Sequence, residues 1–332
     1  NAMALPVGGG PLVDPFGGRA DLEAGLIRAV GDPLQRFAED GLRPLRACRF
    51  ASQLGFEVEA ATRSAIPERL NVARKVAMER VFTELDKLLR GSEPQRGLGL
   101  LAESGLLDLW LPELRPMVGC GQNRHHAHDV WRHTLEVVRA APAESALRWA
   151  GLLHDVGKPG TRSVGPDGEI HFYGHEAPSL ELAAGIFERL KASHALRKAA
   201  LALIRHHGTH PTEAWGDAAC RRFLGRLEAD GLALDTWAAF RLADQRGKGQ
   251  AWGLHLSDHT QLMVRLETLK AAKPPLSVRD LALDGAALMR LADRPGGPWL
   301  GDLQKRLLEA VLDDPAVNTP ERLAERVVRE FP

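Results

Sequence analysis

The stretch from residue 147 to residue 158 reads Leu-Arg-Trp-Ala-Gly-Leu-Leu-His-Asp-Val-Gly-Lys, and it decides the fold. Leu147 and Ala150 recur at helical spacing, with Leu152 and Leu153 beside them, which predicts an apolar helix. The end of that helix carries His154 and Asp155 side by side. A histidine–aspartate pair in this setting, followed by Val-Gly-Lys, favours a metal site over two unrelated surface residues.

Further histidines and an aspartate are spread along the chain around this pair. They are His133, His175, the adjacent His206 and His207, and Asp244. Neutral imidazoles and carboxylates suit Mn, Ni, Co, Fe, Zn or Mg, and open coordination positions would hold water. A bound ion lowers the pKa of that water and supplies hydroxide to attack phosphorus, while Lys158 is placed to neutralise a phosphate oxygen. We therefore interpret Asp155 and Lys158 as catalytic.

Helical periodicity dominates the rest of the chain and predicts an all-α protein. Leu98, Leu101 and Leu106 recur near helical spacing, and the single tyrosine of the sequence leaves few segments that resemble sheet. Two stretches differ. Residues 12–18 indicate a short extended piece bounded by turns, and residues 165–173 predict a loop or small hairpin between helices.

The composition excludes several classes of protein. A length of 332 residues allows two or more cores. The formal net charge of zero argues against a general polyanion binder, so RNA affinity must come from local patches. No apolar run approaches the roughly 20 residues that span a bilayer. Three widely separated cysteines favour a reducing cytoplasm and argue against disulfides and a zinc ribbon.

A basic strip is predicted between residues 32 and 50. Arg43, Arg46 and Arg49 recur every three residues, and Asp40 lies one helical turn before Arg43. A carboxylate acceptor beside a planar guanidinium donor can imitate the hydrogen-bonding edge of a base. The alternative is a solvated charged face with an internal ion pair.

The order His, His-Asp, Asp resembles the HD superfamily of metal-dependent phosphohydrolases. The resemblance implies that the core metal ligands are His133, His154, Asp155 and Asp244. It further implies that His175 and either His206 or His207 are the extra ligands of members that hold two ions. Asp129 is expected as a supporting partner or additional ligand. The remaining histidines are expected to be ordinary surface or loop residues: His125, His126, His128, His171, His194, His210, His255 and His259.

The sequence around the basic strip resembles that of bacterial CCA-adding tRNA nucleotidyltransferases and poly(A) polymerases. Leu-Val-Asp-Pro-Phe-Gly-Gly from Leu12 is similar to the end of their polymerase head, and Arg-Phe-Ala-Glu-Asp from Arg36 is similar to their neck helix. The resemblance implies that Asp40 and Arg43 read CTP or ATP, with Glu39 and Arg46 completing the nucleotide-binding set. Residues 76–85 are expected to support this pocket, and the tail stretch 295–301 and Asn318 also fit the family. Pro44 departs from its pattern and is expected to loosen the helix.

The resemblance also implies a domain plan. Residues 1–30 would be the remnant of a nucleotidyltransferase head, 31–115 the neck and body, 116–250 the HD domain and 251–332 a helical tail that binds tRNA. The Gly-rich loop and Asp-x-Asp pair that bind Mg²⁺ in the head do not occur in this sequence. The opening Asn1-Ala2-Met3 indicates either a start within a head motif or a tag scar before an initiator methionine.

Two main functions are therefore expected. One is the body of a cytoplasmic CCA-adding enzyme, working on the tRNA 3′ end with CTP and ATP when a head is present in the chain or in a partner. The other is a metal-dependent phosphohydrolase with 2′,3′-cyclic phosphodiesterase or phosphatase activity. A non-catalytic tRNA-binding scaffold is the alternative. The further partners that we consider are a separate head domain and a second copy of the chain in a homo-oligomer.

Overall fold

A computed structural model describes residues 3–123, 127–209, 215–249 and 256–331. The chain forms two units, one of residues 1–208 with 239–252 and one of residues 209–238 with 253–332. Helices dominate both units, which confirms the all-α prediction. Among the described residues, no helix has the length and apolarity needed to cross a membrane.

The arginine-rich segment forms two helices, α2 (Pro33–Glu39) and α3 (Arg43–Leu54), so the prediction of one neck helix was wrong. Asp40 has extended backbone at the end of α2. Gly41 follows it, and a Cβ atom there would lie 2.6 Å from the carbonyl oxygen of Val72. The close approach of these two backbones therefore coincides with the break between the helices.

Pro44 does not loosen α3, contrary to the expectation from sequence. It lies in the first turn, where the missing N–H has no helical acceptor to lose, and its side chain is buried. Leu45, Cys48 and Ala51 are also buried, and this face of α3 packs on α6 (Met78–Leu89) and α7 (Pro94–Glu103). All three cysteines are free thiols, as predicted.

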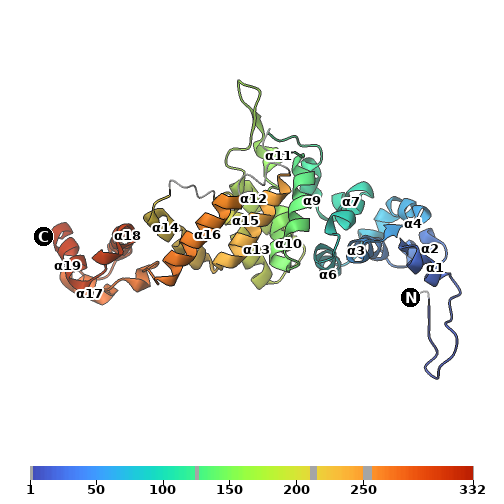
Figure 1. Cartoon of the computed structure of the whole chain (residues 1–332), viewed down its shortest axis with the longest axis horizontal. Coiled ribbons are helices and arrows are strands. Elements are labelled where there is room, and N and C mark those ends of the chain that lie inside the picture. The colour runs from blue at the N-terminus through green and yellow to red at the C-terminus, as the bar shows by residue number, and fades with distance from the viewer. Residues whose placement is uncertain (1–2, 124–126, 210–214, 250–255, 332) are drawn as a thin grey trace. The chain divides into compact units, whose positions relative to one another are not determined.

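The helices that carry the histidine–aspartate residues pack together in the first unit, as Figure 1 shows. The bundle consists of α9 (Val130–Ala140), α10 (Ser145–Leu153), α12 (Glu176–Arg189), α13 (His194–His207) and α15 (Leu234–Gly247). Trp149 of α10 is fully buried, and its ring packs against those of Phe82 in α6 and Phe187 in α12 at centroid distances of 5.7 and 5.6 Å.

Shorter elements complete the first unit. They are α1 (Gly18–Glu23), α4 (Ala60–Ala65), η1 (Pro67–Arg69), α5 (Leu70–Ala73), α8 (Leu106–Trp110), η2 (Pro112–Met117) and α11 (Lys158–Thr161).

Strands are few and short in the described part of the chain. β1 (Leu26–Ile27) pairs in parallel with β2 (Glu57–Val58). β3 (Ser163–Val164) pairs antiparallel with β4 (Ile170–His171), which confirms the hairpin alternative for this region. The predicted extended piece near the N-terminus is present only as one antiparallel bridge, between residues 4 and 13.

The second unit is helical and has its own apolar core. Its elements are α14 (Asp217–Asp230), α16 (Leu256–Ala271), η4 (Val278–Asp280), α17 (Gly285–Leu291), α18 (Pro298–Asp313), η5 (Pro315–Val317) and α19 (Pro320–Glu330). Leu288, Leu303 and Leu323 are fully buried where α17, α18 and α19 meet. The guanidinium of Arg221 anchors α14 to the end of α18 by donating to the carbonyl oxygens of Leu312 and Asp313.

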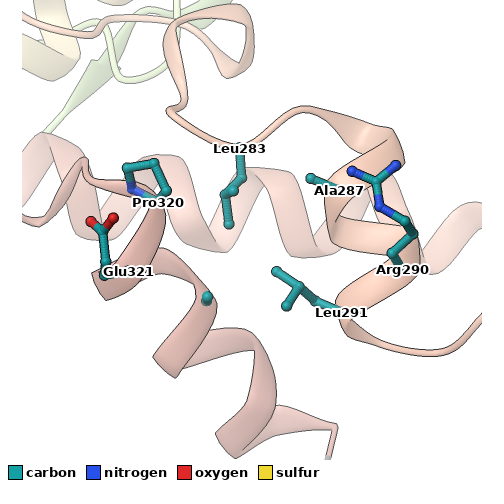
Figure 2. A pocket seen from close by; sticks show the side chains of 7 residues that line it. Leu283, Ala287, Arg290, Leu291, Pro320 and Glu321 are labelled. Atoms are coloured by element: carbon teal, nitrogen blue, oxygen red, sulfur yellow. The ribbon is translucent and has the colours of Figure 1, made fainter.

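A shallow pocket lies between α17 and α19 (Figure 2). Leu283 and Leu291 point into it, while Arg290 and Glu321 lie on opposite sides. The pocket contains none of the predicted ligand or nucleotide-binding residues, so the candidate chemistry lies in the first unit.

Candidate metal centre and arginine-rich neck

The four predicted core ligands come together from three helices of the bundle. His133 lies in α9, His154 and Asp155 follow the end of α10, and Asp244 lies in α15. The Nε2 atom of His133 is 3.1 Å from Asp244 Oδ1 and 3.3 Å from His154 Nε2. His154 Nε2 is also 3.1 Å from Asp155 Oδ2. The ligand atoms of His133, His154 and Asp244 thus form one compact, buried cluster, which we call cluster A.

A second group of ligand atoms, cluster B, consists of Asp155, His175 and His207. His175 Nε2 lies 3.2 Å from His207 Nε2 and 3.3 Å from Asp155 Oδ1. Asp155 therefore turns Oδ2 towards cluster A and Oδ1 towards cluster B. A carboxylate placed in this way has the geometry needed to bridge two neighbouring ions.

Backbone carbonyls orient three of the imidazoles. In each case a ring Nδ1 atom lies within hydrogen-bonding distance of the carbonyl oxygen three residues earlier: His154 with Gly151 at 3.0 Å, His175 with Phe172 at 2.9 Å and His207 with Ile204 at 2.6 Å. A carbonyl oxygen can only accept, so the pattern places a proton on Nδ1 and leaves Nε2 as the ring nitrogen that faces the clusters. This is the tautomer that a metal ligand needs, and the donor set therefore fits divalent ions.

The sequence left His206 and His207 as alternatives, and the structure separates them. Adjacent residues of α13 point about 100° apart. The Nε2 atom of His207 belongs to cluster B, whereas the buried imidazole of His206 contributes to neither cluster among the described residues.

The buried charges shift one another's pKa. Burial lowers the pKa of His154, but the carboxylates of Asp155 and Asp244 outweigh it and raise that pKa to about 9. Burial raises the pKa of Asp155, yet His154 and Lys158 hold it well below its usual range. Burial likewise opposes ionisation of Asp244, and Lys248 with the two cluster A imidazoles keeps its pKa low. Both carboxylates are therefore ionised and able to bind a cation.

Lys158 contacts the cluster itself. Its Nζ atom lies 2.8 Å from Asp155 Oδ2 and donates to Gln122 Oε1 at 2.8 Å. The side chain is largely buried, and the ammonium lies 5.4 Å from the centre of the Phe172 ring. Its charge is thus directed at a carboxylate that faces both clusters.

Asp129 has a structural role in place of the expected one as ligand or supporting partner. One carboxylate oxygen caps α9 by accepting from the N–H of Arg132 at 2.7 Å, and the other accepts from the N–H of Gly119 at 2.8 Å. With both oxygens bound to backbone, Asp129 belongs to neither cluster.

The sequence did not predict the role of two glycines, Gly157 and Gly247, that allow close packing at the site. A Cβ atom on Gly157 would lie 2.6 Å from the carbonyl oxygen of His175 and from the N–H nitrogen of Ser179. One on Gly247 would lie 3.0 Å from His133 Nδ1. Only Gly157 carried a signal, because it lies within the His-Asp-Val-Gly-Lys motif, and Gln122 carried none.

The remaining histidines were expected at the surface or in loops. His171 lies in β4, and its ring stacks on that of Tyr173. His259, in α16, is buried, contrary to expectation. Four others lie outside the described residues: His125, His126, His210 and His255.

The side chains of the predicted base readers of the neck have separate partners, although the Arg43 N–H donates to the carbonyl oxygen of Asp40 at 3.0 Å. Arg43 Nη1 donates to Glu39 Oε2 at 2.5 Å. Asp40 accepts from the N–H of Leu42 at 3.0 Å through Oδ1, and its Oδ2 lies 3.4 Å from the guanidinium of Arg80 in α6. Each base reader therefore has its own partner, which holds its polar group in place.

The three arginines of the basic strip differ in burial and in partner. Arg49 is largely buried and donates to the buried carboxylate of Glu84 at 2.6 Å. Arg46 lies 3.8 Å from Glu84, with 43% of its side chain exposed. The stretch 76–85, predicted to support the nucleotide pocket, thus contacts the neck through Glu84 and Arg80.

Two families of known domains match the chain. Residues 55–117 match the probable RNA and SrmB binding site of polymerase A, and residues 125–243 match the HD domain. Asp244 immediately follows the second match.

Relatives match over most of the chain. An A-adding tRNA nucleotidyltransferase from Deinococcus radiodurans is 38% identical, over 93% of this chain and 72% of the relative. A multifunctional CCA protein from Burkholderia pseudomallei is 35% identical, over 89% of this chain and 71% of the relative.

Solved structures give the same result. The CCA-adding enzyme of Bacillus stearothermophilus, solved with CTP, superposes with a TM-score of 0.69 at 25% identity, over 99% of this chain and 71% of that one. The Thermotoga maritima CCA-adding enzyme, solved with tRNA, has a TM-score of 0.51 at 18% identity, over all of this chain and 71% of that one, a likeness of fold.

Proposed function

The chain belongs to the tRNA nucleotidyltransferase family, and we propose that it acts at the 3′ end of tRNA and carries a metal-dependent phosphohydrolase site. The observation that supports the hydrolase is the position of Asp155. Its two oxygens lie 3.1 Å from His154 in cluster A and 3.3 Å from His175 in cluster B. Scattered surface histidines would not place two ligand sets on opposite sides of one buried carboxylate.

The proposed roles follow from the contacts. Cluster A and cluster B would hold divalent ions, which supply Lewis acidity and an activated water for attack on a phosphoester. The Nδ1 contacts of His154 and His175 to backbone keep their rings oriented. Lys158 holds Asp155 ionised and would place a positive charge beside an incoming phosphate. The substrates that we propose are 2′,3′-cyclic nucleotides or nucleotide phosphomonoesters.

Metal analysis and hydrolysis of 2′,3′-cyclic nucleotides test this site. Asp155→Asn preserves shape and removes the bridging charge, so we expect turnover to fall by more than the roughly 10–100-fold seen when a supporting residue is lost. Asp302→Asn, which changes an exposed carboxylate of α18 in the second unit, is the matched control and should retain turnover. Wild-type protein that binds metal and tRNA without hydrolysing any of these substrates would support a scaffold role in place of the hydrolase.

We also propose that the neck reads CTP or ATP in a protein that carries a nucleotidyltransferase head with its Mg²⁺ ions. The supporting observation is that Asp40 and Arg43 are each fixed by a different partner, Arg80 and Glu39, and keep polar edges at a half-exposed surface. Arg43→Ala should impair nucleotide addition to a tRNA that lacks its 3′ end. If that variant adds CTP and ATP as well as wild type, the neck does not read the base.

A further inference from the structure

Tyr173 is a large aromatic residue exposed beside the metal centre. It is 77% exposed, the most exposed aromatic side chain among the large hydrophobics of the described residues. Its ring stacks almost parallel on that of His171, with centroids 4.9 Å apart and an interplanar angle of 13°. One face is therefore supported from behind, and the high exposure leaves the rest of the ring accessible.

The β3–β4 hairpin holds this aromatic pair in place. His171 is opposite Ser163 in the ladder, and Ser163 Oγ donates to its carbonyl oxygen at 3.4 Å. The hairpin, coloured yellow-green in Figure 1, extends beyond the end of α11. A ring that stacks on a neighbour held in a strand loses little freedom when a flat ligand binds to it.

The backbone then connects Tyr173 directly to cluster B. The carbonyl oxygen of Phe172 lies within hydrogen-bonding distance of His175 Nδ1, at 2.9 Å. The ring of Phe172 faces the Lys158 ammonium, which lies 5.4 Å from the ring centre. Gly174 has a φ of +70°, a left-handed conformation that turns the chain between Tyr173 and His175. Two residues span at most about 7 Å, so the Tyr173 backbone lies within one nucleotide's length of a cluster B ligand.

We propose that Tyr173 is a specificity-determining residue on which the base of a nucleotide phosphoester stacks while its phosphate lies at the metal clusters. This inference rests on the proposed hydrolase function. Stacking on an aromatic ring tolerates every base, because each base has a π face. The site should therefore favour nucleotides over base-free sugar phosphates and discriminate weakly among the bases. His171 is the positioning residue that supports the ring.

Kinetics with a matched pair of substrates test the proposal. Adenosine 2′,3′-cyclic phosphate carries a base, and ribose 2,3-cyclic phosphate presents the same phosphoester without one. For Tyr173→Ala we expect KM for the nucleotide to rise roughly 5- to 100-fold, the range of one aromatic–base stack. The kcat value and the kinetics on ribose 2,3-cyclic phosphate should not change. Tyr173→Phe keeps the stacking surface and should restore KM for the nucleotide.

Controls separate the two proposals. Phe16→Ala removes another exposed aromatic ring, which lies outside the hairpin, and should leave both substrates unaffected. If wild type hydrolyses neither substrate, the hydrolase proposal fails. If wild type hydrolyses both and Tyr173→Ala leaves the KM ratio of the two substrates unchanged, the stacking proposal alone is overturned. Calorimetric binding of adenosine, which has the base and no phosphoester, to metal-loaded protein gives a readout without turnover and should weaken by the same factor in Tyr173→Ala.

Discussion

Lys158 Nζ and Asp155 Oδ2 lie 2.8 Å apart in a buried part of the helical bundle. The same carboxylate faces the imidazoles of both ligand clusters. The lysine therefore acts as the permanent counter-ion of the residue that joins the two clusters. Its removal should leave the buried carboxylate of Asp155 with only the cluster imidazoles, or bound metal ions, to compensate its charge.

The variant Lys158→Met should destabilise chelator-treated protein by about 3–5 kcal/mol, the usual loss when one partner of a buried ion pair is removed. Excess Mn²⁺ should reduce this loss, because the ions compensate Asp155 in place of the ammonium. Urea unfolding with and without Mn²⁺ measures both effects. Lys191→Met removes an exposed lysine paired with Glu79 and should have a smaller effect that is independent of metal. A metal-independent loss in Lys158→Met would contradict the counter-ion role.

Metal stoichiometry should depend on which cluster is altered. His207→Ala removes a ligand of cluster B only, and Asp244→Asn one of cluster A only. Each should leave about half of the wild-type metal content by elemental analysis after dialysis. Asp155→Asn should lose ions from both clusters, because its two oxygens face one cluster each. Equal metal content in the three variants would show that Asp155 is not a bridge.

Gly157→Ala should perturb the metal centre without changing any ligand. The new Cβ atom would lie 2.6 Å from the carbonyl oxygen of His175 and from the nitrogen of Ser179, so α12 must shift. We expect a destabilisation of about 1–3 kcal/mol, typical of overpacking, together with weaker metal binding through the displaced His175. Thermal unfolding and metal titration measure the two effects. Gly160→Ala, three residues later and with no atom within 4 Å of its Cβ, is the control and should change neither.

The sequence predicted the helical fold, and it named most of the residues that the structure gathers into clusters A and B, because both features have local signals. Periodic leucines indicate a helix, and the histidine–aspartate pair at the end of that helix is a motif of adjacent residues that can be recognised in the sequence. The neck break was missed because it depends on the approach of Gly41 to Val72, which are distant in sequence. Helical spacing alone therefore placed Asp40 and Arg43 on one turn, where the structure has a junction.

The identity of the second-cluster histidine could not be predicted for a similar reason. His206 and His207 have the same chemistry, and the choice depends on the rotation of α13 about its own axis. That rotation is set by packing against α10 and α12. For Asp129 the sequence assigned a role that the structure does not show. A carboxylate one turn before a ligand is equally suited to cap the helix, and Asp129 caps α9.

The two arginines that contact Glu84 should differ sharply in their effect on stability. Arg49→Met removes the 2.6 Å partner of a carboxylate whose side chain is only 7% exposed. We expect a loss of about 3 kcal/mol in the free energy of unfolding, the lower end for a buried pair, because Arg46 and Lys87 still lie 3.8 and 4.0 Å from that carboxylate. Arg46→Met, with its side chain 43% exposed, should lose at most about 1 kcal/mol. Urea unfolding of the two variants gives the comparison directly.

The double change Arg49→Met with Glu84→Gln should recover part of the loss, because no buried charge is then left without its partner. Equal losses for the two single variants, or no recovery in the double variant, would show that Glu84 does not hold the neck to α6 through Arg49.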